Sequence, residues 1–196
     1  MSSARNNRAC VLAFVLLLVA FLAACSHEAE PSSEAPVASS PPQTAFPLPP
    51  TKGTSLSNLG WSLSDGTHRI FSDYKGKVLV LDFYATWCGP CRNSIPHLIE
   101  LQKKYQTRGV AVVGLNVGGP GDLDKVPDFA REFGIQYPLG EPDSELVTFL
   151  LSDSDAIPQT FVFDRQGQLV ERFLGFGPMT GGRIDLAVES ALPQAP

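Results

Sequence analysis

Two cysteines, Cys88 and Cys91, stand two residues apart within the stretch "LDFYATWCGPCRNSIP" (81–96). Two thiols at this spacing can close into a disulfide and reopen, and so accept or donate two electrons. A structural crosslink and a soft-metal site are the alternatives. A bridge between residues this close encloses almost no loop and restrains the unfolded chain little, which argues against a crosslink. A zinc site would need further ligands, and the sequence has no second C-x-x-C to supply them.

The residues around the pair predict where the chain would place it. The apolar run "KVLVLDFYA" (77–85) is typical of a strand buried on both faces. The stretch 91–109 has apolar residues at helical spacing, with Pro96 expected to kink the helix. Cys88 therefore falls where a strand passes into a helix, and the free N–H groups and dipole of the helix start would lower its pKa. Cys91 lies one helical turn further along the chain. It is expected to attack the mixed disulfide that Cys88 forms with a substrate and so to release the substrate.

The remaining pattern predicts an α/β fold. Asp65-Gly66 marks the turn of a hairpin within 55–77, and the buried strand predicted at 110–118 should pair in parallel with 77–85. We expect a mixed central sheet with helices on both faces and an N-terminal β-hairpin extension. The further expected elements are a flexible loop at 118–125, helices at 126–134, 144–152 and 181–192, and an antiparallel hairpin at 160–175.

The sequence "WCGPC" (87–91) resembles the active-site sequence of the thioredoxin-fold family, and the whole stretch 81–96 resembles that family over its length. The N-terminal hairpin, the tether that precedes it and the segment between "VVGLNVG" and "IPQTF" resemble its extracytoplasmic TlpA/ResA-like branch. The similarity covers roughly residues 60–190. It implies a thioredoxin-like fold and a thiol–disulfide oxidoreductase that needs no cofactor and no metal.

The resemblance also implies roles for residues around the cysteines. Trp87 would flank the surface on which a substrate docks, although plain packing is the alternative. Gly89 and Pro90 would fix the turn between the sulfurs, and this dipeptide accompanies a reducing potential in the family. Ile157-Pro158, in "AIPQTF" (156–161), resembles the family's cis-proline loop, which packs against the cysteine pair and offers backbone groups to an incoming peptide.

Asp82 lies on the predicted buried strand, six residues before Cys88. Burial of a carboxylate without a charged partner is costly and raises its pKa. Thioredoxins themselves have an aspartate at this place that assists proton transfer to and from the buried cysteine, whereas many extracytoplasmic relatives have asparagine. We therefore predict that Asp82 is a general base toward Cys91, with a purely structural aspartate as the alternative.

The first part of the chain predicts export. Arg5 and Arg8 precede the apolar stretch 11–24, which is typical of a signal peptide and too short to be a comfortable membrane anchor. "LAAC" (22–25) resembles the bacterial lipoprotein signal and implies a lipid on Cys25. Residues 26–53, rich in Pro, Ser, Ala and Glu, read as a disordered tether. The predicted domain boundaries are thus 1–25 for the signal, 26–53 for the tether and 54–193 for the thioredoxin-like domain.

Charge restricts the class of partner. The whole chain has a formal net charge of −5, and all 20 acidic but only 13 of the 15 basic residues follow Cys25. Such an acidic chain is a poor match for nucleic acid.

The predicted function is that of an extracytoplasmic disulfide reductase, anchored by lipid to a membrane of the bacterial cell envelope and facing the periplasm or the outer surface. Its substrates would be protein disulfides, with apocytochrome c as the client that the branch suggests, and a membrane thiol reductase would supply electrons. The alternatives are a disulfide oxidase or isomerase, and a lipoprotein that binds a soft metal without catalysis.

Overall fold

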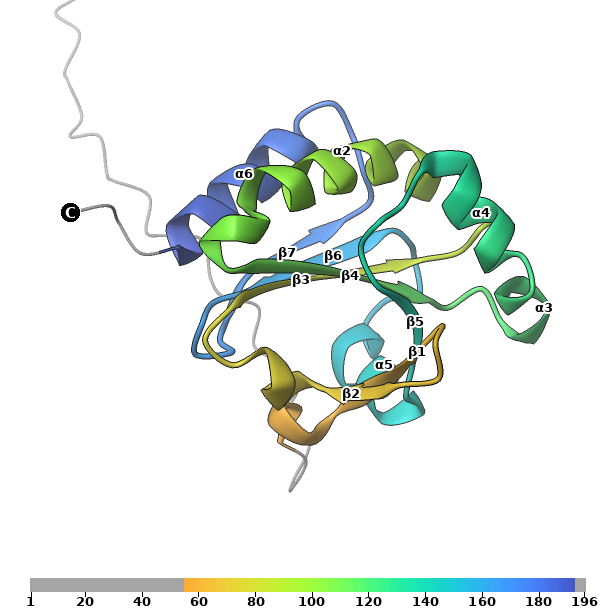
Figure 1. Cartoon of the computed structure of the whole chain (residues 1–196), viewed down its shortest axis with the longest axis horizontal. Helices are drawn as coiled ribbons and strands as arrows, with labels where there is room; N and C mark the ends of the chain where they lie inside the picture. The colour runs from red at the N-terminus through yellow and green to blue at the C-terminus, as the bar shows by residue number, and fades with distance from the viewer. Residues whose placement is uncertain (1–54, 193–196) are drawn as a thin grey trace, which may run out of the picture. The chain divides into compact units, whose positions relative to one another are not determined.

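The computed structural model describes residues 55–192, which contain a seven-stranded mixed sheet with helices on both faces (Figure 1). The strand order is β2-β1-β5-β4-β3-β6-β7. This confirms the predicted α/β fold. The predicted signal peptide, the tether and the lipidation site Cys25 lie outside the described residues. Within residues 55–192, no helix has both the length and the apolar character that crossing a membrane requires.

The centre of the sheet is the strand that precedes the cysteines. Strand β3 pairs in parallel with β4 and antiparallel with β6, and every one of its residues is buried. The continuous apolar run fits this position, because a central strand covered on both faces has no side that meets water. The strands are β1 (Gly60–Leu63), β2 (His68–Ile70), β3 (Val78–Tyr84), β4 (Val110–Asn116), β5 (Leu139–Pro142), β6 (Gln159–Phe163) and β7 (Leu169–Leu174).

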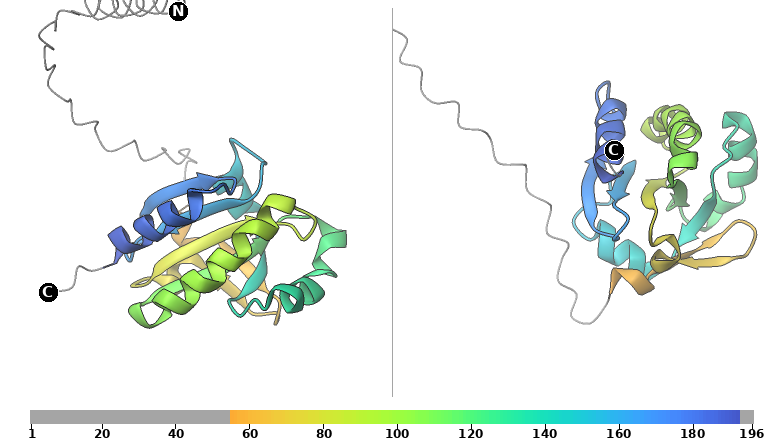
Figure 2. Two further views of the ribbon diagram at one scale, coloured as in Figure 1. Left: turned by 90° about the horizontal axis from the view of Figure 1, so that it is seen from above. Right: turned by 60° about the vertical axis from the view of Figure 1, so that its left-hand side comes forward.

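The helices divide between the two faces of the sheet. The α-helices are α2 (Gly89–Tyr105), α3 (Pro120–Leu123), α4 (Val126–Phe133), α5 (Ser144–Leu151) and α6 (Thr180–Ala191). Residues of α2, α4 and α6 pack with Val78 and Val80 of β3, whereas residues of α5 pack with Leu79 and Leu81. Alternate side chains of a strand point to opposite faces, so β3 supplies both cores. Figure 2 shows α2 and α6 side by side over one face of the sheet.

The N-terminal hairpin extends the main sheet. Strand β1 pairs antiparallel with both β2 and β5. Its turn is where the sequence predicted it: Gly66 has a φ of 82°, and the Asp65 Oδ1 accepts a hydrogen bond of 2.8 Å from the Thr67 N–H. Positive φ is the conformation that glycine adopts without a steric penalty, which is why Asp-Gly predicts the turn well.

The sequence prediction missed a short α-helix and a short strand, and also the 3-10 helices η1 (Leu56–Asn58), η2 (Phe71–Tyr74) and η3 (Gln106–Arg108). The segment 118–125, predicted as a loop, contains α3, and β5 was not predicted at all. Strand β5 is only four residues long and includes Gly140 and Pro142, which disfavour a strand in isolation. Its tertiary context requires the glycine, because a Cβ at Gly140 would lie 2.5 Å from the carbonyl oxygen of Ser62 in β1.

Candidate functional site

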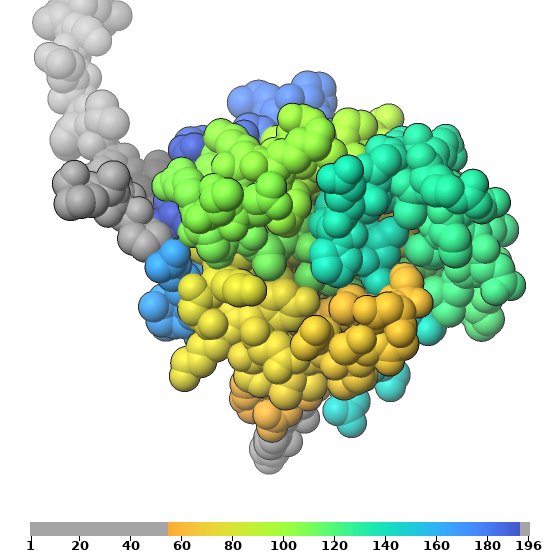
Figure 3. All heavy atoms as spheres, viewed as in Figure 1, coloured from red at the N-terminus to blue at the C-terminus, as the bar shows by residue number. Residues whose placement is uncertain are grey.

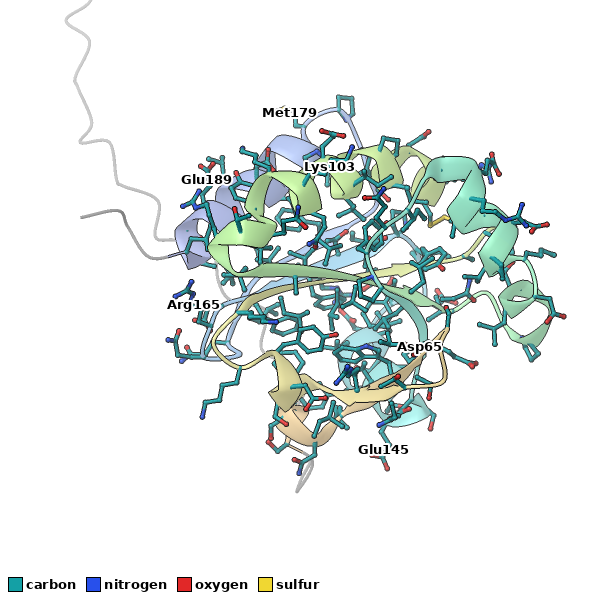
Figure 4. The ribbon with its side chains drawn as sticks, in the orientation of Figure 1. Asp65, Lys103, Glu145, Arg165, Met179 and Glu189 are labelled. Atoms are coloured by element: carbon teal, nitrogen blue, oxygen red, sulfur yellow. A yellow bond between two sulfur atoms is a disulfide. The ribbon has the colours of Figure 1, made fainter. Side chains whose placement is uncertain are left out.

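Cys88 is the N-cap of α2. Its backbone is extended, with φ −79° and ψ 109°, and its Sγ accepts a hydrogen bond of 3.2 Å from the Cys91 N–H. Pro90 lies in the first turn, where its missing N–H leaves no intrahelical bond unmade. Cys88 and Cys91 form a disulfide, with 5.2 Å between their Cα atoms; it is the yellow bond beside the start of α2 in Figure 4. The helix begins two residues earlier than predicted, so Cys91 lies in its first turn and Cys88 caps it.

The two sulfur-bearing residues differ in access. Cys88 retains 5% of its surface, whereas Cys91 has none. Trp87 is 64% exposed, and Gly89 and Pro90 are also exposed. Among the described residues, Cys88 is thus the more accessible of the two cysteines, and the exposed Trp87 and Gly89-Pro90 adjoin it in the chain.

The second predicted site segment reaches the same place. The Ile157-Pro158 bond is cis, as the resemblance to the thioredoxin-fold family implied, and the Ile157 carbonyl oxygen lies 3.7 Å from the Cys88 Sγ. Ile157 is partly buried and Pro158 is buried, and the Pro158 carbonyl accepts a hydrogen bond of 2.8 Å from the Gly175 N–H. Segments 69 residues apart in the chain thus meet at one sulfur atom.

Asp82 lies on the central strand β3, on the face that α2 covers. It is 1% exposed, and its Oδ1 accepts a hydrogen bond of 2.7 Å from the Thr160 hydroxyl on β6. By strand alternation it shares the face of Val80 and Tyr84, which belong to the same core as Cys91. Burial raises the pKa of Asp82 to about 7, and the hydrogen bond from Thr160 opposes that rise in part. Its carboxyl group therefore exchanges protons near neutral pH.

A second buried carboxylate holds the turn in front of Cys88, and the sequence analysis missed it. Asp122 of α3 is 2% exposed. Its oxygens accept hydrogen bonds from the Thr86 N–H at 2.8 Å, from the Thr86 hydroxyl and from the Asn116 amide at 2.8 Å. Burial alone would raise the pKa of Asp122, but the hydrogen bonds from Thr86 and Asn116 outweigh it and lower the pKa. A Cβ at Gly118 would lie 2.2 Å from an Asp122 oxygen, so the loop requires glycine there.

The first turn of α2 is also tied to α4. The Arg92 guanidinium pairs with Glu132 and lies over the Phe133 ring at 4.8 Å and the Phe129 ring at 5.5 Å. In the space-filling view of Figure 3, α2 and the segment that contains α4 lie beside each other on the surface. The positive charge of Arg92 is thereby matched by Glu132.

The loop that carries the cis-proline is held by a group of side chains that the sequence analysis also missed. Gln159, which follows Pro158, is fully buried and hydrogen-bonds to two carbonyl groups of the loop and to Arg172 of β7. A lone glutamine after a proline gives no signal in a single sequence, because its partners become neighbours only in the folded sheet.

Comparison with known proteins agrees with this geometry. Residues 53–172 match the AhpC/TSA family. The chain is 34% identical over 128 residues to the thiol-disulfide oxidoreductase ResA of Geobacillus kaustophilus, covering 64% of this chain and 69% of that protein. ResA of Bacillus subtilis is 28% identical over 125 residues, which cover 64% of this chain and 68% of the relative.

The fold of this chain is also similar to that of a solved thiol:disulfide interchange protein. The crystal structure of a thiol:disulfide interchange protein of the thioredoxin family from Chlorobium tepidum superposes with a TM-score of 0.58 at 29% identity, covering 71% of this chain and 99% of that one. Together with the match over most of the described residues, these similarities show that the chain belongs to the AhpC/TSA family of thioredoxin-fold proteins and is a thiol–disulfide oxidoreductase.

Proposed function

We propose that this oxidoreductase works as a disulfide reductase, with Cys88 as the attacking cysteine and Cys91 as the resolving one. The Cys88 thiolate attacks one sulfur of a client disulfide, forms a mixed disulfide and releases the other client sulfur as a thiolate. The Cys91 thiolate then attacks the Cys88 Sγ, which closes the Cys88–Cys91 disulfide and releases the second client sulfur. The client gains two electrons, and with two protons becomes a dithiol, while the enzyme loses them.

The observation that carries this assignment is the position of the Cys88 Sγ at the start of α2. It accepts the Cys91 N–H and lies at the positive end of the helix dipole, which favours a thiolate. Cys91 has no exposed surface and cannot meet a client first, but it is one helical turn away and can attack the mixed disulfide. The unequal access of the two residues supports the order of the two attacks.

We propose that Asp82 handles the proton of Cys91. The resolving thiol must lose its proton before it attacks, and a buried carboxyl group with a pKa of about 7 can accept that proton near neutral pH. Its place on the α2 face of β3 supports this role, because Cys91 packs in the same core.

We also propose that a client polypeptide docks between Trp87 and the cis-proline loop. The exposed Trp87 and the exposed Gly89-Pro90 turn adjoin Cys88 in the chain, and the Ile157 carbonyl oxygen lies 3.7 Å from the Cys88 Sγ. These groups would orient the client disulfide toward the Cys88 Sγ.

The reducing direction, the cellular place and the partners follow from the motif and the signal sequence. Gly89-Pro90 accompanies a reducing potential in the thioredoxin-fold family. The predicted lipoprotein signal ending at Cys25 supports a lipid-anchored domain outside the cytoplasm, so a membrane thiol reductase must return the pair to its dithiol form. Apocytochrome c is the client class proposed from the resemblance to the ResA-like branch.

A Cys25→Ser variant tests the lipid anchor. Because it lacks the cysteine that would be lipidated, the variant protein should move from the membrane fraction to the soluble fraction of the envelope.

Insulin reduction by the dithiol form tests the mechanism. The wild type should turn over with a chemical reductant, and Cys88→Ser should be inactive. Cys91→Ser should stop after one attack, with the client bound to Cys88 by a disulfide. Trapping from cell envelopes with Cys91→Ser would then identify the clients. Turnover by Cys88→Ser would refute the proposed order of attack.

A further inference from the structure

One buried amide side chain, that of Gln159, holds two carbonyl groups of the loop before β6. The Gln159 Nε2 donates to the carbonyl oxygens of Ser154 at 2.9 Å and of Ala156 at 2.8 Å. Its Oε1 accepts from Arg172, from the Nε at 2.9 Å and from an Nη at 2.6 Å. Carbonyl groups only accept and a guanidinium only donates, so these partners fix the orientation of the amide. Both donors and both lone pairs of the amide are used.

Arg172 links this amide to the start of the same loop. Its other Nη donates to both carboxylate oxygens of Asp153, at 2.8 and 2.7 Å, and its guanidinium lies 5.4 Å from the centre of the Phe161 ring. The Arg172 side chain is only 10% exposed, whereas Asp153 is 62% exposed. We call Gln159, Arg172 and Asp153 the loop bracket. It joins β7, β6 and the loop before the cis-proline into one hydrogen-bonded unit.

The carbonyl groups bound in this loop flank the one that faces the cysteines. The carbonyls of Ser154 and Ala156 are bound by Gln159, and that of Pro158 by the Gly175 N–H. The carbonyl of Ile157, between the last two, lies 3.7 Å from the Cys88 Sγ. Fixing the carbonyl on each side of Ile157 fixes the peptide planes that set where its own oxygen points.

We propose that Gln159 and Arg172 are positioning residues that hold the cis-proline loop at the height and angle needed to dock a disulfide-bearing polypeptide. This inference rests on the proposed function, because it deepens the role given there to Ile157 and Pro158. The loop bracket touches neither sulfur atom, so its loss should weaken the binding of a polypeptide client and leave the pKa of the Cys88 thiol unchanged. The rate of reduction of a small disulfide, which needs no backbone contact with the loop, should also stay unchanged.

Arg183 serves as the control for Arg172, because each guanidinium pairs with a carboxylate and lies 5.4 Å from an aromatic ring, although the Arg183 side chain is 59% exposed and that of Arg172 only 10%. Arg183 lies 5.4 Å from the Phe173 ring and pairs with Glu171, but it does not touch the loop. Arg172→Met and Arg183→Met are compared by steady-state kinetics with insulin and with Ellman's reagent as the small disulfide. We expect Arg172→Met to raise the KM for insulin about tenfold, which is about 1.4 kcal/mol and the order of one hydrogen bond to a charged group. Its rate with Ellman's reagent and the pH profile of Cys88 alkylation should match the wild type, and Arg183→Met should match the wild type with both substrates.

Two variants that retain Arg172 decide the question if Arg172→Met does not fold. Asp153→Asn weakens the exposed end of the bracket and should raise the KM for insulin above that of the wild type. Gln159→Glu keeps the acceptor for Arg172 but places a carboxylate oxygen against the Ser154 and Ala156 carbonyls, and should raise the KM for insulin more than Asp153→Asn does.

An unchanged KM for insulin in Asp153→Asn and Gln159→Glu would overturn the proposal, as would equal losses with both substrates or equal losses in the two arginine variants. Those results leave the proposed function standing. A folded wild-type protein that reduces neither insulin nor Ellman's reagent would instead refute the proposed function and this inference with it.

Discussion

The carboxyl group of Asp82 takes its chemistry from the residues that enclose it. It lies on the α2 face of β3, almost without exposure, and its hydrogen bond from Thr160 offsets only part of the cost of burying a charge. The sequence predicted both its burial and its raised pKa, because an acidic residue in the middle of a long apolar run has no route to water. The roles of Gln159 and Asp122 could not be predicted, since each depends on partners that only the fold brings close, such as Thr86, 36 residues from Asp122.

The raised pKa of Asp82 predicts how stability depends on pH. The carboxyl group titrates at about 3.8 in the unfolded chain and at about 7 in the fold, so between these values the unfolded chain has already lost the proton that the folded chain retains. Ionisation therefore favours unfolding increasingly from about pH 4 to about pH 7, and the loss levels off above that range. The cost approaches about 4 kcal/mol at 1.36 kcal/mol per pKa unit.

Asp82→Asn should remove this dependence, because the amide does not ionise and its Oδ1 can still accept from Thr160. We expect the free energy of unfolding of the variant, relative to the oxidised wild type, to rise between pH 4 and pH 8. Urea denaturation at a series of pH values measures it. The same difference at every pH would show that Asp82 has an ordinary pKa.

At the scale of elements, the site is the meeting of three segments: the turn between β3 and α2, the loop before β6, and α3. The first was predicted from a long apolar strand followed by a helical repeat, and the second from the resemblance of Ile157-Pro158 to the cis-proline loop of the thioredoxin-fold family. Helix α3 was predicted as a loop since "GGPGD" at 118–122 carries no apolar periodicity. What orders it is the buried Asp122 carboxylate, which binds Thr86 and Asn116. Side-chain anchoring of this kind replaces apolar packing as the source of local order.

This anchoring predicts a large difference between two nearby aspartates. Asp122→Ala would leave the Thr86 N–H, the Thr86 hydroxyl and the Asn116 amide without their buried acceptor, at a cost of about 3 kcal/mol at pH 7. Asp124, two residues further on, is exposed, and Asp124→Ala should change stability by less than about 0.5 kcal/mol. Chemical denaturation of both variants measures the difference. Equal losses would mean that the hydrogen bonds to Asp122 contribute nothing to the fold.

At the scale of the whole molecule, the topology explains why the cysteine pair is well supported. Strand β3 is held by β4 and β6 along its length and is covered by α2 on one face and α5 on the other. The sequence predicted this arrangement of layers, including the hairpin extension. It could not predict that β5 joins the hairpin to the main sheet, because β5 is short and its pairing with β1 depends on the close approach at Gly140.

The proposed reducing direction makes a prediction for the whole fold. A reductase gives up electrons readily, so its disulfide form must be favoured by the native structure relative to its dithiol form. We expect the oxidised protein to have the higher Tm, by about 3 °C for each kcal/mol by which its free energy of unfolding exceeds that of the dithiol form. We also expect a reduction potential near the value for thioredoxin, about −270 mV, and far from the value for a strong oxidant, about −120 mV. Thermal scans of the two forms and equilibration with dithiothreitol buffers measure both. A higher Tm for the dithiol form would point to an oxidase.

Rapid quenching of a single turnover tests whether Cys88 attacks the client and Cys91 resolves the mixed disulfide. The dithiol form is mixed with a disulfide-bonded client, stopped with acid at intervals and mapped by peptide mass spectrometry. We expect a mixed disulfide on Cys88 that decays as the Cys88–Cys91 disulfide appears, with one client disulfide reduced for each enzyme disulfide formed. A client attached first to Cys91 would refute this order of attack.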